Sequence, residues 1–122
     1  MDGLTLIDTD ILIDAGRDIQ DAVEFLERVE TQARLTISVI TQMELIVGCQ
    51  SKRELRSVDK FLTRFESINL NEHISSLAVE LLRTYRLSHG LLIADAFIAA
   101  TALYLNAPLS RRIKRIFALS QI

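Results

Sequence analysis

The sequence of 122 residues predicts an α/β fold with a mainly parallel central sheet. Short apolar runs rich in β-branched residues alternate along the chain with longer segments that have helical spacing. Hydrophobic residues make up 49% of the chain, which is enough for a buried core. The length suits one domain, which we expect to span residues 1–122.

Three short apolar segments are expected to form the strands of this sheet. Residues 4–7 read LTLI, and residues 35–40 read LTISVI, which is rich in β-branched side chains. A third, shorter strand is expected at residues 68–70. Runs of this length and composition are typical of buried strands.

Five segments predict helices, because their apolar residues recur at three- and four-residue spacing or are almost continuous. Residues 52–65 and 72–87 each have one apolar face, which we expect to be buried in the core. The Ala-rich segment 94–105 is almost wholly apolar, so we expect it to be central. The predicted helices are residues 18–30, 42–49, 52–65, 72–87 and 94–105.

Composition excludes several classes of protein. With 14 basic and 16 acidic residues the net charge is −2, which argues against general adhesion to nucleic acid but allows a local basic rim around an acidic site. No apolar run reaches the roughly 18 residues of a membrane span, so no membrane partner is expected. The start of the chain does not resemble a signal peptide. Cys49 is the single cysteine, so we expect a reducing, cytoplasmic location.

Three carboxylates occupy equivalent places in the predicted fold. Asp8 comes directly after the first strand, and Glu44 lies near the start of the helix that follows the second strand. Asp95 lies near the start of the predicted central helix. Sites in such sheets form where strands end and helices begin, so we expect the three side chains to meet at the carboxyl edge.

Converging carboxylates repel one another, and their pKa values rise unless a cation joins them. Oxygen ligands suit Mg²⁺ or Mn²⁺, and such a metal can orient a water and stabilise charge on a phosphodiester. Each carboxylate alone also has a simpler interpretation as a cap or as an acid favoured by a helix dipole. Asp10 and Asp14 are interpreted in that simpler way, as local caps or supporting groups.

Three motifs carry a resemblance to a known family. They read LIDTDILID, ISVITQMELIVGC and LLIADAFIAATALYLNAPL, and they stand in the order and at the spacing of PIN-domain ribonucleases. Within that family the sequence is most similar to VapC-type toxins of toxin–antitoxin pairs. The resemblance covers roughly residues 4–109.

The resemblance implies an α/β/α sandwich, usually dimeric, that cleaves RNA with Mg²⁺ or Mn²⁺. It also implies a cognate VapB-type antitoxin that inserts into the active-site groove and holds the toxin inactive. Matched by motif, Asp8, Glu44 and Asp95 are the metal-binding catalytic residues. Thr9 matches the small hydroxyl residue that often follows the first aspartate of the family, and is expected to play a supporting role.

The C-terminal tail departs from the family pattern. Where the family usually has an Asn or Asp that completes the metal site, this chain has Arg111 and Arg112, which would oppose a metal. One coding sequence that fits residues 108–122 becomes PLITKNKADFRAIPD, an ordinary family tail, when one base is added to its second codon. We therefore hypothesise that the tail results from a frameshift. The alternative is natural divergence towards a basic tail that contacts RNA. In either case the metal site lacks its fourth residue, so we expect reduced ribonuclease activity.

Other functions stay open on the sequence alone. An inactive toxin form could retain dimer and antitoxin binding. The pair Asp8 and Asp10 resembles the start of haloacid-dehalogenase-type phosphatases, although Leu12 stands where Thr or Val is expected. A phosphoacceptor receiver domain also gathers acids at a sheet edge, but it needs a lysine that usually precedes a proline, and Ala107 precedes Pro108 here.

Overall fold

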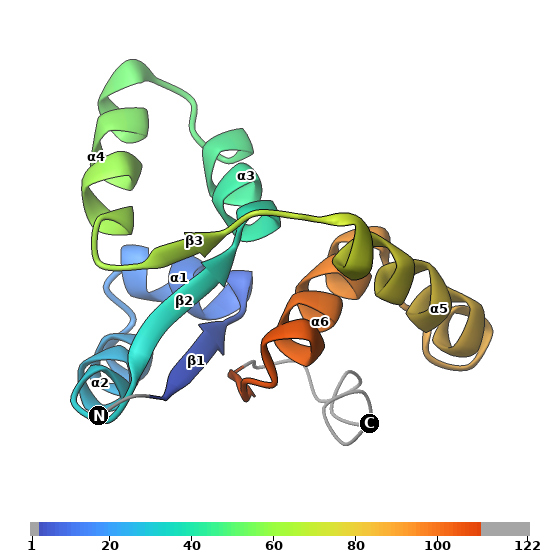
Figure 1. Ribbon diagram of the computed structural model, residues 1–122. Coiled ribbons are helices and arrows are strands. Elements are labelled where there is room, and N and C mark those ends of the chain that lie inside the picture. The colour runs from blue at the N-terminus through green and yellow to red at the C-terminus, as the bar shows by residue number, and fades with distance from the viewer. Residues whose placement is uncertain (1–2, 111–122) are drawn as a thin grey trace.

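The computed structural model describes residues 3–110, and its centre is a sheet of four parallel strands. The strands are β1 (Leu4–Ile7), β2 (Arg34–Ser38), β3 (Glu66–Ile68) and β4 (Leu109–Ser110). Their order in the sheet is β3-β2-β1-β4, so β1 and β2 are central (Figure 1). The predicted α/β fold with a parallel sheet is confirmed.

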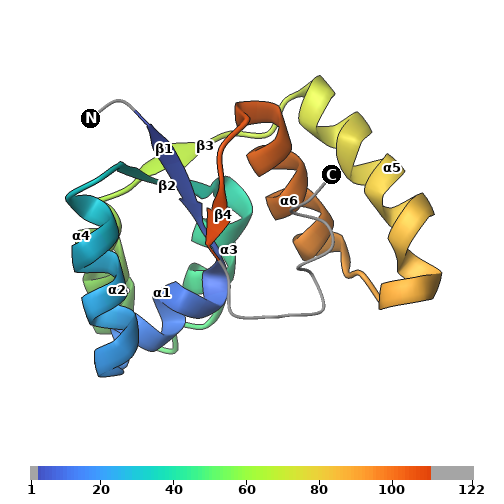
Figure 2. The ribbon, with the colours of Figure 1, turned by 90° about the horizontal axis from the view of Figure 1, so that it is seen from below.

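Helices cover both faces of this sheet. In Figures 1 and 2, α1 and α2 lie against one face, while α6 lies against the other face and α5 packs outside α6. The helices within the described residues are α1 (Thr9–Gly16), α2 (Gln20–Glu30), α3 (Val39–Val47), α4 (Lys52–Leu62), α5 (Glu72–His89) and α6 (Ile93–Leu105).

The alternation of side chains along β1 explains the layers. Leu6 packs with Ile98 and Ala102 of α6, whereas the next residue, Ile7, packs with the apolar side chains of α1 and α2. Successive residues of a strand point to opposite faces, so a strand buried on both sides needs a continuous apolar run such as LTLI. The three-layer α/β/α sandwich follows from this burial.

Two elements were not predicted from the sequence. α1 directly follows Asp8 and buries Ile11, Leu12 and Ala15, although the aspartates of this run make it look like a turn. β4 is only two residues long, and its pairing with β1 in the tertiary structure defines it. Both additions bring further backbone to the carboxyl end of β1.

Several boundaries also differ from the prediction. α3 begins at Val39 rather than residue 42, because the Ser38 hydroxyl accepts a hydrogen bond of 3.0 Å from the backbone N–H of Ile40 and caps the helix there. The strand predicted at residues 35–40 therefore ends at Ser38. β3 lies two residues earlier than the predicted strand at residues 68–70.

The predicted burial of the apolar face of residues 52–65 is realised only in part. α4 has no fully buried residue, but Phe61 and Leu62 at its end pack partly buried against the core, and Phe65 just after it is buried. α4 and the end of α3 project from the body of the molecule (Figure 1), so their side chains meet solvent on most sides. In α5, by contrast, Ile74, Ala78 and Leu81 are buried against α6, as the pattern of residues 72–87 predicts. No helix among residues 3–110 has the length and apolarity that crossing a membrane requires.

Candidate functional site

The carboxyl edge of the sheet holds a pocket that contains all three predicted site carboxylates. Asp8 follows β1, Glu44 lies in the second turn of α3, and Asp95 is the third residue of α6. All three line a pocket of about 510 Å³. The fold therefore brings together side chains that are 36 to 87 residues apart in the chain. Their role as catalytic metal ligands stays a prediction.

Asp8 is the most buried of these carboxylates, with 5% of its surface exposed. Burial disfavours its charged form and is the main reason that its pKa rises from 3.8 to about 6. The negative charge of Asp10 raises the pKa further, as do the charges of Asp95 and Glu44. A backbone hydrogen bond from Thr9 opposes the rise. This pocket therefore has a negative potential that a cation would relieve.

Hydroxyl groups hold Glu44 in its place. The Oγ1 of Thr9 donates to Oε1 of Glu44 at 2.6 Å, and it also lies 3.0 Å from Oγ1 of Thr41. A threonine hydroxyl has one proton. Because Thr9 donates its proton to Glu44, the hydroxyl of Thr41 must donate to that of Thr9. Thr41 is fully buried. The two threonines thus form a chain of hydrogen bonds from the core to the carboxylate of Glu44.

Asp95 lies at the positive end of a helix dipole. Its Oδ2 accepts a long hydrogen bond of 3.4 Å from the backbone N–H of Leu92, at the start of α6. The simpler interpretation of Asp95, an acid favoured in the first helical turn, is therefore realised. The same carboxylate also lines the pocket, so the two interpretations are compatible.

Sequence reasoning missed part of the pocket. Asp10 also lines it and has the largest charge effect of any carboxylate on Asp8. The signal was present in the pattern Asp-Thr-Asp, but only the unpredicted α1 turns Asp10 towards this edge. An apolar rim was missed as well, because Met43, Val47 and Leu92 line the pocket with 52%, 83% and 51% of their surfaces exposed.

The donors in the pocket fit a hard cation in chemistry. All are oxygens, and Mg²⁺ usually takes one or two carboxylates and keeps several waters. Within residues 3–110, however, no three Asp, Glu, His or Cys side chains stand close enough to form a metal centre without rearrangement. The tail with Arg111 and Arg112, and with it the frameshift hypothesis, lies outside the described residues.

Comparison with known proteins tests the resemblance. Residues 5–111 match the protein family described as PIN domain. The chain is 35% identical over 100 residues to Ribonuclease VapC10 of Mycobacterium tuberculosis (strain CDC 1551 / Oshkosh). This match covers 81% of this chain and 74% of that protein. It is also 31% identical over 114 residues to Ribonuclease VapC1 of Methanocaldococcus jannaschii. That match covers 92% of this chain and 77% of that protein.

Solved structures agree with these relatives. A toxin–antitoxin complex from Klebsiella pneumoniae has a chain that is 32% identical, with a TM-score of 0.78 over 93% of this chain and 90% of that chain. A chain of VapBC2 from Rickettsia felis, in a crystal structure with a DNA fragment from the promoter, is 28% identical to this chain. Its TM-score is 0.79, and the match covers 95% of this chain and 92% of that chain. The motif resemblance is thereby confirmed: this chain belongs to the PIN-domain family, among its VapC-type members.

Proposed function

We propose that this chain is a metal-dependent endoribonuclease that hydrolyses RNA phosphodiesters and is inhibited by a cognate antitoxin. The observation that carries the proposal is the shared pocket of Asp8, Glu44 and Asp95 in a PIN-domain chain. The two curated relatives are named as ribonucleases, which supports RNA as the substrate.

In this proposal Asp8, Glu44 and Asp95 hold Mg²⁺ or Mn²⁺. When bound, the metal polarises a water for attack and stabilises charge on the phosphodiester. Asp8 would hold the cation in its ionised form, and a bound cation would favour that form because it would replace the solvation that burial removes. Thr9 supports the site by orienting the carboxylate of Glu44 through their 2.6 Å hydrogen bond.

A VapB-type antitoxin, a homodimer and a cytoplasmic location belong to the same proposal. The solved relatives include toxin–antitoxin and VapBC complexes, which supports an antitoxin partner. The exposed apolar rim of Met43, Val47 and Leu92 beside acidic groups supports such contact as well. A second candidate is an inactive form that keeps dimer and antitoxin binding, which the cationic Arg111 and Arg112 of the tail favour.

A cleavage assay tests the proposal. Purified protein is incubated with single-stranded RNA in Mg²⁺, in Mn²⁺ and in EDTA, and we expect cleavage only with metal. Asp8→Asn and Asp95→Asn should each remove most of the cleavage. Asp18→Asn is the matched control, because Asp18 is exposed and has a φ of 59°, a conformation that Asn accepts readily.

Two outcomes would count against the active enzyme. Cleavage that persists in EDTA, or that neither site substitution lowers, would remove the reaction from this pocket. An unmodified chain that fails to cleave RNA but binds its antitoxin in a pull-down would favour the inactive form.

A further inference from the structure

α4 carries four cations on one face. Its basic residues are Lys52, Arg53, Arg56 and Lys60. At 3.6 residues per turn these positions fall within an arc of about 100°, with Lys52, Arg56 and Lys60 in one row. The apolar residues of α4 lie on the opposite side. We refer to the four cations as the α4 stripe.

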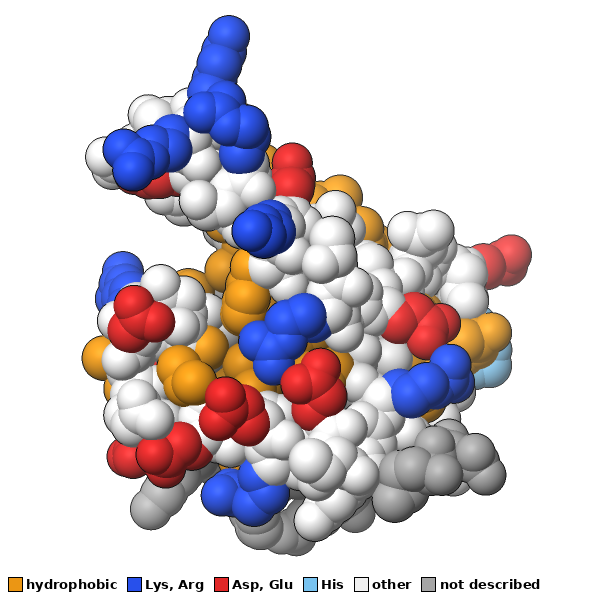
Figure 3. Space-filling view, turned by 90° about the vertical axis from the view of Figure 1, so that its left-hand side faces the viewer, with side chains coloured by type: hydrophobic (Ala, Val, Ile, Leu, Met, Phe, Trp, Pro, Cys, Tyr) orange, Lys and Arg blue, Asp and Glu red, His pale blue; other side chains and the backbone are white. Residues whose placement is uncertain are grey.

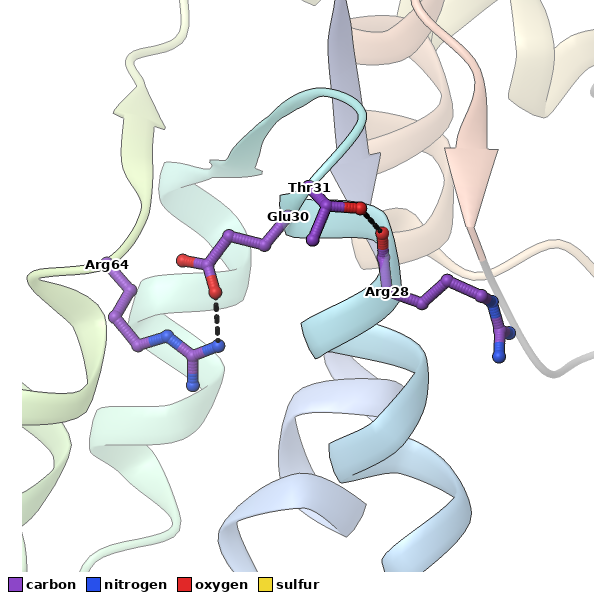
Figure 4. Close-up of polar contacts among 4 residues, drawn as sticks. All are labelled: Arg28, Glu30, Thr31 and Arg64. Atoms are coloured by element: carbon purple, nitrogen blue, oxygen red, sulfur yellow. Dashed lines mark hydrogen bonds and ion pairs between the residues drawn. The ribbon is translucent and has the colours of Figure 1, made fainter.

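No ion pair within residues 3–110 neutralises the α4 stripe. The neighbouring Arg64 is different, since it lies 3.0 Å from Glu30 at the end of α2 and is tied to the body of the molecule (Figure 4). Glu54, in the first turn of α4, accepts a hydrogen bond of 2.9 Å from the backbone N–H of Gln50. Its carboxylate thus caps the start of α4 and forms no ion pair with the stripe.

The α4 stripe is unfavourable for the isolated chain. Lys52 and Arg53 stand in the first turn, where the helix dipole disfavours cations. Arg56 is four residues from both Lys52 and Lys60, so like charges repel along the row, and Asp59, three residues from Arg56, offsets part of this repulsion. Phe61 and Leu62, on the opposite side of α4, pack partly buried against the core, so packing explains why the cations face solvent but not why they gather in one row. An anionic partner would turn each of these costs into an attraction.

The α4 stripe begins after a four-residue connection from α3, the helix that supplies Val47 to the acidic pocket, and α3 lies between α4 and α6 in Figure 1. Val47 lines the pocket, and only residues 48–51 separate it from Lys52, a reach of at most about 18 Å along the chain. Figure 3 shows Lys and Arg side chains gathered at the projecting end of the molecule, where α4 begins. The net charge of the whole chain is −2, so this basic region is local.

We propose that the α4 stripe binds the phosphate backbone of single-stranded RNA and holds the strand beside the pocket. This rests on the proposed function. Carboxylates in the pocket repel a polyanion, so a strand that reaches them needs cations nearby to hold it. Contacts of Lys and Arg with phosphates carry charge but no base information, so the contribution is independent of RNA sequence.

The salt dependence of binding measures these contacts. For single strands the slope of log K against log salt is about −0.7 for each neutralised phosphate. Four contacts contribute about −2.8 on this relation, and removal of two should flatten the slope by about 1.4. Arg53→Gln with Arg56→Gln is the test variant. Arg17→Gln with Arg83→Gln is the control, because it removes the same charge from exposed sites outside α4.

Binding is measured by fluorescence anisotropy with a labelled oligouridine, over a series of NaCl concentrations, in an Asp8→Asn background that prevents cleavage. We expect a flatter slope for the α4 variant and a smaller change for the control. Replacement of Arg53 and Arg56 by Lys should keep the original slope, since charge is what the phosphates recognise. Circular dichroism checks that each variant is folded.

An unchanged slope in the folded α4 variant would overturn the α4 stripe as an RNA surface. Polyglutamate that binds more tightly than oligouridine of equal charge would overturn it in favour of an acidic protein partner. If the chain cleaves RNA but the α4 variant does not change the salt slope, the proposed function stands and the α4 stripe is overturned as an RNA surface. If the chain does not cleave RNA but the slopes change as expected, the α4 stripe stands as an RNA surface and the proposed enzymatic function is overturned.

Discussion

Replacement of Asp8 by Asn should stabilise the metal-free protein above about pH 6. The carboxyl of Asp8 is 5% exposed, and its pKa is about 6 in the fold against 3.8 for an ordinary Asp. Below pH 3.8 the group is protonated in both states and has no effect. Between these two values the folded state keeps a proton that the unfolded state has lost, so stability falls as pH rises. Above about pH 6 the loss is complete.

The magnitude follows from the two pKa values. Their difference, at about 1.4 kcal/mol for each pH unit, gives a loss of about 3 kcal/mol by pH 8. Asn cannot ionise, so the variant should be more stable than the original chain by up to that amount at pH 8 and similar to it near pH 3.5. The assay is urea unfolding in EDTA at several pH values. Taking the difference between the two proteins cancels the titration of all other groups.

Asp18→Asn is the matched control, because it makes the same substitution at an exposed position. A gain from Asp8→Asn that is the same at every pH would refute the electrostatic reasoning, and so would the absence of any gain. Mg²⁺ in place of EDTA should stabilise the original chain but not the variant, because a ligand that binds only the folded state adds to its stability.

Further predictions concern residues around the site and one turn. Thr41→Val should lower the stability by about 1 kcal/mol and reduce RNA cleavage. Thr41→Ser should keep cleavage because it keeps the hydroxyl, at a cost of about 0.8 kcal/mol for the buried methyl group; urea unfolding and the cleavage assay measure both. Gly90 has a φ of 66°, so Gly90→Ala should cost about 1 kcal/mol in urea unfolding and Gly90→Asn less. Arg64→Gln should cost less than about 1 kcal/mol, and NaCl should shrink the difference.

Local patterns predicted much of the fold. Residues 4–7 form a strand with the expected bounds because four consecutive residues, LTLI, can be buried on both faces only in the centre of a sheet. The Ala-rich segment 94–105 forms α6 one residue earlier than expected, and most of its side chains that face the sheet are buried. Once these elements were assigned, the parallel order of strands was enough to place Asp8, Glu44 and Asp95 at one edge.

Other features depended on tertiary contacts. α1 exists because Ile11 and Leu12 pack against the sheet, which outweighs the turn-like appearance of its aspartates, and it brings Asp10 to the pocket. β4 exists because two residues pair with β1. The sequence also could not predict how far α4 is exposed, because an amphipathic pattern shows which side of a helix is apolar but not how fully the fold covers that side. The sequence by itself determined which residues could be buried and which acids follow the strands. Only the tertiary structure decided which of those surfaces found a partner, because burial and pairing are properties of two segments and not of one.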